Sequence, residues 1–474
     1  MNDIQVGYPE ELSIFEKPAK NVGIKQARCI TYYPVNDFST QGVIQFRIPN
    51  NSTSYVDLSK TRLNISCKIL RKDGKSMVPY QIRKSVSDDK ATNSTDTSTT
   101  DDKADASANT ATAGNKATSE AVDKDDDYDI CLATNNAMHS LFSRVDVSLQ
   151  DKILTNADDC YPYEAYIKTL LMTTKEEKQS LESQGFFDDT GYDIFNSNWV
   201  LKTEDNPLYK RGKLFENSKE VDFSGPICSS VMDIQKLLPY GLTLGITLHP
   251  SKDSFCLLSA VKDKEYHMVI TKATLSVCMI EVAPEVAIAH SQIMENTPAI
   301  FPYKKTEVKK FTLATGIYSA SINDPFQGRL PEQIIIGIVR DSAQNGSFLE
   351  NPFYFEHASL NFLGVTIDGQ PMGIDPIQPK YGLYDEEGNY IVAHQTLNGV
   401  GGNEKINPIG RLDYPNGRTL YRFQEEFEGP LKRTGNMSIS FRFDYALKKG
   451  MCVIVYARFP GGLKVDKSRA VYDF

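Results

Sequence analysis

Acidic side chains gather in one segment of the sequence, where they could bind a cation. Asp385, Glu386 and Glu387 follow one another, and Asp375 lies shortly before them. Carboxylate oxygens are the ligands that Ca²⁺ and Mg²⁺ prefer in proteins. A solvated loop explains the same residues without a ligand. We therefore interpret the segment as a loop and predict no metal site there.

Two further patterns could bind phosphate groups, one through backbone amides and one through lysines. The run Gly399-Val400-Gly401-Gly402 could approach a phosphate closely, but it follows a polar stretch and opens no helix, which favours a flexible loop. The lysine clusters are not interleaved with aromatic side chains, as a groove for single-stranded nucleic acid would be. We therefore expect no sequence-specific binding of nucleic acid. The clusters are Lys304-Lys305 with Lys309-Lys310, and Lys448-Lys449.

Linear motifs of common catalytic sites are missing. The chain has no G-x-x-x-x-G-K-[ST] phosphate loop, no H-E-x-x-H helix, no zinc-type Cys/His spacing and no G-x-S-x-G turn. A triad assembled in space would escape such a scan. The six histidines stand singly at 139, 249, 267, 290, 357 and 394, where a structural role is the commoner one. We predict no catalytic, cofactor-binding or metal-binding residues.

The composition is that of a protein with sizeable apolar cores. The chain has 474 residues, 40% of them hydrophobic, and a formal net charge of −9. Its first residues are acidic where a signal peptide is basic, and no apolar run approaches the ~18 residues of a membrane span. The eight cysteines form no C-x-x-C pair, so we expect reduced thiols in a cytosolic or nuclear compartment. They lie at 29, 67, 131, 160, 228, 256, 278 and 452.

Strand patterns dominate both halves of the chain. Residues 61–69, 141–149 and 242–248 alternate polar and apolar side chains, as half-buried strands do. Helical spacing is clear only at 162–171, with Asp159 as a possible cap, and Thr174 to Glu177 resembles a capping box. The pattern predicts an all-β protein of two β-sandwiches with a few short helices in loops.

The division of the chain follows from changes in composition. Residues 86–127 contain no aromatic residue, Leu or Ile, so they cannot bury enough apolar area to order, and we predict a disordered acidic insertion. Residues 1–25 are predicted to form an N-terminal arm or a disordered tail. We place a first sandwich at 26–292, interrupted by the insertion, and a second at 293–474.

The two halves resemble each other in sequence, which indicates an internal duplication. Residues 139–154 align without a gap on 357–372, so that turns Gln150-Asp151 and Asp368-Gly369 coincide. Residues 242–248 align on 437–443, and 255–258 on 451–454 after one extra residue. The inward set predicted for the first pair is Leu141, Val145, Val147 and Leu149, matched by Ser359, Leu363, Val365 and Ile367, with Asp146, Ser148, Gly364 and Thr366 pointing away.

An ordered series of short segments resembles the double-jelly-roll major capsid proteins of Polintons, adintoviruses and related virophage-like elements. The segments run from about residue 30 to the C-terminus and cover most of the chain, whereas the acidic insertion departs from the family pattern. They are YVDLSKTRL at 55–63, HSLFSRVDV at 139–147, YPYEAY at 161–166, SKDSFCL at 251–257, NPFYF at 351–355, DYPNG at 413–417 and CVIVYA at 452–457.

The resemblance implies a structural role in a virus shell. Each half would be an eight-stranded jelly roll, and three chains would form a homotrimer with a pseudo-hexagonal outline. Such capsomers would tile an icosahedral virion capsid beside a single-jelly-roll penton protein at the vertices, after synthesis and assembly in the cytoplasm or nucleus of the host cell. We expect contacts between subunits from the helix at 162–171 and the loops 185–220 and 376–410.

Two other classes of function fit paired β-sandwiches. A glycan-processing enzyme with two jelly rolls would have acidic residues in a cleft near the junction of its halves. A carbohydrate-binding or adhesive β-sandwich protein is the other alternative. Secretion would be expected of both, whereas the sequence predicts no signal peptide.

Overall fold

The computed structural model describes residues 23–38, 42–50, 54–78, 129–189, 207–259, 264–381, 389–400, 407–425 and 433–474. The insertion at 86–127 lies outside these residues, so its disorder stays a prediction. The first strand begins at Ile24, so residues 24 and 25, the last two of the segment predicted as an arm, belong to this strand.

Strands of the first half form two antiparallel sheets that face each other across an apolar core. One sheet has the order β1-β10-β3-β7 and the other β2-β8-β5-β6. Alternate residues such as Ile65 of β3 and Val147 of β5 are buried between them. The bounds are β1 Ile24–Tyr32, β2 Ile44–Ile48, β3 Tyr55–Arg71, β5 Phe142–Leu149, β6 Lys152–Ile153, β7 Val221–Pro226, β8 Leu244–Pro250 and β10 Tyr266–Val282.

The second half repeats this arrangement strand for strand. Its sheets have the orders β11-β18-β13-β16 and β12-β17-β14-β15, with β19 (Val471–Asp473) added to β18. Because each half has the strand order of a jelly roll, the predicted fold class of two consecutive eight-stranded jelly rolls is confirmed. The bounds are β11 Ala299–Leu313, β12 Ser319–Asn323, β13 Gln333–Arg340, β14 Leu360–Ile367, β15 Gln370–Pro371, β16 Leu420–Gln424, β17 Met437–Phe443 and β18 Met451–Val465.

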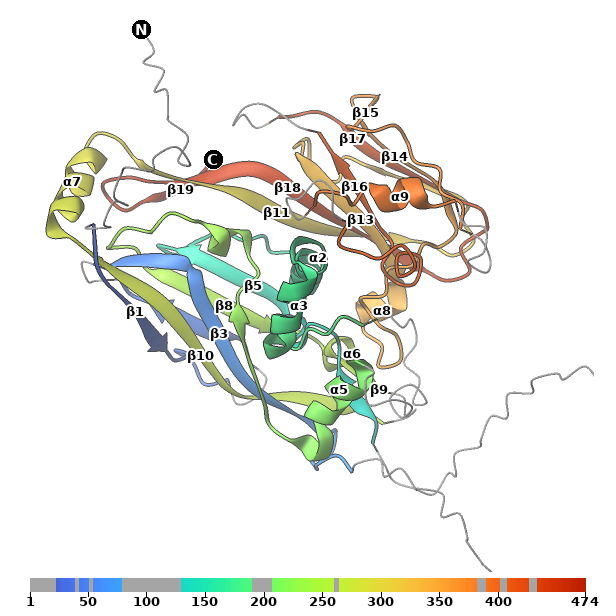
Figure 1. Ribbon diagram of the computed structural model, residues 1–474, viewed down its shortest axis with the longest axis horizontal. Coiled ribbons are helices and arrows are strands. Elements are labelled where there is room, and N and C mark those ends of the chain that lie inside the picture. Colours follow the sequence, from blue (N-terminus) through green and yellow to red (C-terminus); the bar gives the residue numbers. More distant parts are fainter. Residues whose placement is uncertain are drawn as a thin grey trace, which may run out of the picture.

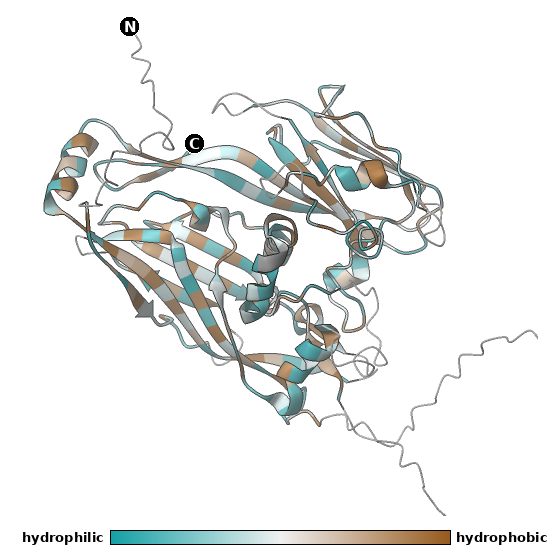
Figure 2. Cartoon of the chain, viewed as in Figure 1, coloured by the Kyte–Doolittle hydropathy of each residue, from teal (hydrophilic) through white to brown (hydrophobic). Residues whose placement is uncertain are grey.

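The two rolls lie side by side, with the helix α2 between them and α7 at one end (Figure 1). Along β3, hydropathy alternates from residue to residue, as expected of strands with one face in a core (Figure 2). The helices are α1 Ala137–Ser140, α2 Tyr161–Met172, α3 Lys175–Ser180, α5 Pro207–Leu214, α6 Asp253–Cys256, α7 Pro284–Met294, α8 Asp341–Asn345 and α9 Ile391–Gln395. Short 3₁₀ turns (η2 Leu181–Gln184, η3 Glu216–Ser218, η4 Ser230–Asp233) and the strand pair β4 Cys131–Ala133 and β9 Leu257–Ser259 complete the described elements.

Equivalent hairpins support the duplication. The turns Gln150-Asp151 and Asp368-Gly369 join β5 to β6 and β14 to β15, and all four residues have positive φ, as a two-residue type I′ hairpin requires. These turns therefore occupy matching corners, as predicted. The predicted inward residues of both strands are buried except Ser359.

A β-bulge at the start of each strand explains why Ser359 was wrongly predicted to face inward. The register shifts between Phe142 and Arg144 in β5, and between Leu360 and Phe362 in β14. A bulge interrupts the alternation of faces. Leu360, rather than Ser359, is therefore the core residue at this end of β14.

Two parts of the predicted alignment are corrected by the strand pairing. Leu149 pairs with Leu244 and Ile367 with Met437, so 244–250 correspond to 437–443, two residues from the predicted match of 242–248. A shift of two residues preserves the face of every side chain, which is why the alternation could not reveal it. Residues 255–258 lie in α6 and β9, and the strand equivalent to β18 is β10, so the match of 255–258 to 451–454 is wrong.

Candidate functional site

A helix that is apolar on more than one side joins the two rolls. Nine of the 12 residues of α2 are buried. Tyr161 and Ala165 belong to the core of the first roll, whereas Ile167 and Leu170 belong to that of the second. A helix packed on one surface needs only one apolar stripe. The predicted helix is confirmed. Its apolar residues are buried within this chain, so a contact of the helix with another subunit, which stays a prediction, would have to use its remaining residues.

The ends of α2 are set by local signals. Pro162 occupies the first turn, where its missing N–H is not needed, but the cap residue is Cys160 without a side-chain hydrogen bond, so Asp159 is not the cap. After the helix, the predicted capping box is confirmed: Thr174 Oγ1 accepts from the Glu177 N–H, and the Glu177 carboxylate accepts from the Thr174 N–H at 2.7 Å.

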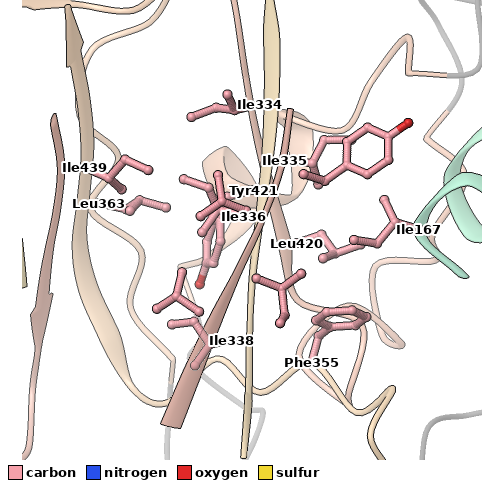
Figure 3. Packing of buried hydrophobic residues seen from close by; sticks show 14 of the residues in the cluster. Ile167, Ile334, Ile335, Ile336, Ile338, Phe355, Leu363, Leu420, Tyr421 and Ile439 are labelled. Carbon is pink, nitrogen blue, oxygen red and sulfur yellow. The ribbon is translucent and has the colours of Figure 1, made fainter. Parts of the chain in front are cut away.

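The sheet that receives α2 is apolar on both faces. In β13, Ile334, Ile336 and Ile338 lie on one side, and Ile335 lies on the side of Ile167 (Figure 3). A strand buried on both faces has a nearly continuous apolar sequence, which explains the run Ile334-Ile335-Ile336. Tyr166 of α2 also stacks on Phe353, with ring centroids 4.4 Å apart. The apolar core of the second roll therefore extends to both faces of this sheet and includes the helix α2 of the first half.

Gly337 permits the close approach of a loop to this sheet. A Cβ at Gly337 would lie 2.5 Å from the Phe355 ring and 2.7 Å from Leu420. The Phe355 ring is fully buried and lies near Tyr166. The absence of a side chain at Gly337 therefore leaves the space that Phe355 needs to reach Tyr166 of the first half.

The predicted basic cluster at 304–310 is used mainly in ion pairs. Lys304 pairs with Glu332 at 2.9 Å, Lys305 with Asp473 at 3.0 Å, and Lys309 with Asp158 at 2.8 Å. The pair between Lys309 and Asp158 crosses from the second roll to the first. Of the second lysine cluster, Lys449 lies 3.6 Å from Glu350. These lysines are thus matched by acids of the same chain.

The six histidines have structural partners. Buried His139 has Tyr161 Oη at 2.8 Å from Nδ1 and Gln184 Oε1 at 3.0 Å from Nε2. Because the amide oxygen can only accept, Nε2–H donates and Nδ1 accepts from the tyrosine hydroxyl. Burial lowers the pKa of His139 to about 4. The remaining contacts are His249 with Asp146, His267 with Asp253, His290 with Tyr55, the His357 ring on Tyr381, and His394 with the carbonyl of Ile409.

Two ion pairs, one buried and one partly exposed, anchor the segment that follows α3. Arg211 of α5 donates to Asp189 at 2.8 Å and to the carbonyl of Ala133 at 3.0 Å. Asp188 accepts from Arg418 of the second half at 2.7 Å. The predicted loop 185–220 is therefore tied to both halves at residues 188 and 189. The adjacent acids after Phe186-Phe187 were the available sequence signal, because charges beside apolar residues need partners.

The two ends of the insertion meet in space. The Asp129 N–H donates to the Val78 carbonyl at 2.9 Å, and the Val78 N–H donates to the Asp129 carboxylate at 2.8 Å. The same carboxylate accepts from Arg71 at 2.6 Å and from the Tyr266 hydroxyl at 2.8 Å. The described residues on either side of the insertion are therefore held together by a buried acid with several partners.

An apolar groove lies along α7, at the end where the two rolls are joined. Its volume is about 590 Å³, and Val286, Ile293 and Ile300 are among its lining residues. Ile288, Ile293 and Ile300 are 58, 61 and 45% exposed. Exposed apolar side chains gathered in one region are typical of a contact surface.

The other predicted motifs are not brought together as a site. Asp375 is exposed, and 385–387 lie outside the described residues, as do Gly401 and Gly402, whereas Val400 is buried. Among the residues that the structure describes, no three His, Cys, Asp or Glu side chains are grouped to hold a metal ion. Within the same part of the chain, no helix is both long and apolar enough to cross a membrane. Parts of the predicted contact loop 376–410 are described, and they contain α9.

Comparisons with known proteins agree with this architecture. An uncharacterized protein of Caenorhabditis elegans is 22% identical over 472 residues, covering 95% of this chain and 98% of its own. A chain of the Sputnik virophage is 9% identical with a TM-score of 0.61, covering 100% of this chain and 93% of that one. The mavirus major capsid protein is 12% identical with a TM-score of 0.52, covering 100% and 96%.

The Faustovirus major capsid protein is a further structural neighbour. It is 10% identical with a TM-score of 0.54, and the match covers 95% of this chain and 92% of that one. No family model matches the chain. At these identities the likeness shows the fold, so this chain has the double-jelly-roll fold of virus major capsid proteins.

Proposed function

We propose that this chain is a major capsid protein, a structural subunit that assembles with copies of itself into a virus or virus-like shell. The observation that carries the proposal is the repeated jelly roll in one chain, matched over nearly the full length by capsid proteins. The protein would act through its surfaces, without enzymatic activity of its own. The matched structures favour this role over the alternatives of a glycan-processing enzyme or a carbohydrate-binding protein.

The buried contact between the rolls supports this role. Since α2 and Phe353 fix the two halves together, one chain presents two similar blocks in a set orientation. Three such chains related by a threefold axis would place six rolls around it, with a pseudo-hexagonal outline. Closed symmetry of this kind sets a copy number without any further factor. We propose the homotrimer as the capsomer of an icosahedral capsid, with 1–25 as an arm and rolls at 26–292 and 293–474.

Partners and location follow from the same proposal. Neighbouring capsomers would be contacted through the outer surfaces, and a single-jelly-roll penton protein would fill the vertices. The protein would be made and assembled inside the host cell and then reside in the virion capsid. The acid partners of Lys304, Lys305 and Lys309 support the expectation of no sequence-specific binding to nucleic acid.

Light scattering and negative-stain microscopy on the purified full-length protein test the proposal. We expect a mass of three chains and particles with a hexagonal outline. A mass of one chain at every concentration, up to that at which shells would form, would contradict the shell role. Shell-like particles seen at higher concentration would support it directly.

A further inference from the structure

Two cysteines face each other across neighbouring strands at one edge of the first roll. Cys29 of β1 pairs directly with Cys278 of β10 in the antiparallel register. Direct partners in such a ladder have Cα atoms about 4.5–5.5 Å apart. This spacing falls within the range of about 4.4–6.8 Å found for disulfides. The backbone thus already holds the two residues at a distance that a disulfide can bridge.

Both thiols lie on the outer face of the sheet. Leu275, Val277 and Met279 of β10 point into the core, so Cys278 between them points outward, where it packs in a small cluster with Tyr55 and Ile280. Cys29 is exposed, whereas Cys278 is buried. The two side chains are within hydrogen-bonding contact of each other. One thiol therefore meets solvent, and the second lies directly behind it.

Charged groups surround the pair. Asp57 of β3 lies opposite Cys278 on the other side of β10, and Lys60 pairs with Asp57 at 3.0 Å. The Lys60 ammonium also interacts with both thiols. Burial raises the pKa of the Cys278 thiol, the neighbouring Cys29 thiol and Asp57 carboxylate raise it further, and Lys60 lowers it by a smaller amount. Since a nearby cation favours the thiolate, Lys60 offsets part of this rise.

We propose that Cys29 and Cys278 form an intramolecular disulfide when the folded protein meets a small disulfide oxidant such as oxidised glutathione. The Cys29 thiolate attacks one sulfur of the oxidant, and one glutathione thiol leaves. The Cys278 thiolate then attacks the Cys29 sulfur of the mixed disulfide, and the second glutathione leaves. Two protein thiols lose two protons and two electrons, and one glutathione disulfide becomes two glutathione thiols.

The bond would tie the edge strand β1 to the roll. In its sheet, β1 pairs with β10, and an edge strand opens more readily than an inner one. The inference concerns one chain alone and does not depend on the proposed shell role. For a protein made in a reducing compartment and later exposed to an oxidising one, the strand would be locked only after synthesis.

Other close cysteines of the described chain lack this combination. Cys131 and Cys256 interact with each other, but both are fully enclosed, and burial raises the pKa of each thiol. Cys160 and Cys452 also interact while buried. An oxidant in solution reaches neither pair in the folded state. The pair of Cys29 and Cys278 differs from these two pairs because one of its thiols, that of Cys29, is exposed to solvent.

Thiol counting on the folded protein tests the proposal. The full-length chain is reduced, freed of reductant, and incubated with oxidised glutathione, and the remaining thiols are then alkylated in denaturant. We expect the count to fall from eight thiols to six, with a peptide that links Cys29 to Cys278. The oxidised protein should melt at a higher temperature than the reduced protein.

Variants separate this bond from other reactions. Cys29→Ser should keep all its seven thiols and show no rise in melting temperature with the oxidant, and Cys278→Ser should retain glutathione on Cys29. Wild-type protein oxidised in urea serves as the control for unselective pairing. The proposal is overturned if the folded wild type keeps eight thiols, carries stable glutathione on Cys29 beside a free Cys278, or forms only disulfides between chains.

Discussion

Val147 and Val365 occupy the same position in the two jelly rolls. Val147 of β5 pairs with Ile246 of β8, and Val365 of β14 pairs with Ile439 of β17. Both valines are at most 1% exposed. In each strand the valine is two residues before the last strand residue and follows a bulge at the strand's start. The duplication predicted from sequence is therefore present at the level of single residues.

Shortening Ile167 should destabilise the contact between the rolls. The side chain is fully buried among residues of the second roll, so Ile167→Ala should lower the free energy of unfolding by about 2–5 kcal/mol. Urea unfolding at neutral pH measures the change. Ile153→Ala, at a 60% exposed position, is the control and should change stability by less than about 0.5 kcal/mol. Equal effects of the two substitutions would show that the packing of α2 between the two rolls does not stabilise the fold.

A methyl group at Gly337 should overpack the same region. Gly337→Ala would force Phe355 or Leu420 to move, and we expect a loss of about 1–3 kcal/mol in stability. Gly42→Ala is the matched control, because nothing lies within 4 Å of the added Cβ there. Thermal unfolding of both variants gives the comparison. A neutral effect at Gly337 would mean that the Phe355 loop adjusts freely.

Burial of His139 predicts a loss of stability in acid. The folded pKa is about 4, because burial disfavours the charged ring, whereas the unfolded value is about 6.5. Between these values the unfolded chain binds more protons, so stability is present above pH 6.5 and is lost as pH falls towards 4. The contribution between pH 7 and pH 5 is about 2 kcal/mol.

His139→Gln isolates this contribution. The variant should lose less stability than the wild type between pH 7 and pH 5, whatever its stability at neutral pH. Groups around the ring, including Tyr161, Gln184 and Cys228, are kept in both proteins. Urea unfolding at the two pH values measures the difference. Parallel pH profiles of the two proteins would show that His139 does not titrate in this range.

Contacts between copies should depend on the groove along α7. Ile293 is 61% exposed beside Ile300, so Ile293→Asp should leave the melting temperature nearly unchanged. If this surface is buried between copies, the charge should weaken the proposed trimer at least about tenfold. Light scattering over a dilution series gives the dissociation midpoint. Ile153→Asp is the control at a similarly exposed site, and an unchanged trimer in Ile293→Asp would place the contact elsewhere.

Deleting residues 86–127 should leave the fold intact. The segment has almost no large apolar residues, and the chain on either side is already joined by the pair Val78 and Asp129. We expect the melting temperature to change by no more than about 2 °C. Asp129→Ala is the contrasting variant and should be clearly destabilised, because Arg71 would lose its buried partner. A large fall on deletion would show that the segment packs on the rolls.

Much of the fold was predictable because alternation fixes the face of each side chain. The strands at 61–69 and 141–149, the turns Gln150-Asp151 and Asp368-Gly369, and the capping box at Thr174 all depend on neighbours in sequence. Ser359 was assigned to the wrong face because a bulge adds a residue to the strand. The predicted alignment of 242–248 on 437–443 was two residues off, because a shift of two residues leaves the alternation of faces unchanged.

The candidate surfaces were harder to predict, because they depend on contacts between distant segments. The spacing of Tyr163, Ile167 and Leu170 predicted a helix, but it could not show whether the apolar face would meet a second roll or a second chain. The sequence also does not indicate that the isoleucines of α7 are exposed, because 284–294 has the apolar spacing of an ordinary helix. Which surface an apolar helix face contacts is decided by how the sheets are arranged in space.

The hydrogen bonds between Val78 and Asp129 hold together the two points of the chain between which residues 79–128 are inserted. Since this contact is made by the flanking residues themselves, the length and composition of the insertion are free to vary independently of the rolls. The entropic cost of closing such a loop grows only slowly with its length. A peptide tag, an epitope or a small folded domain inserted here should therefore be carried by every copy, and in a shell it would be displayed at a fixed place on each capsomer.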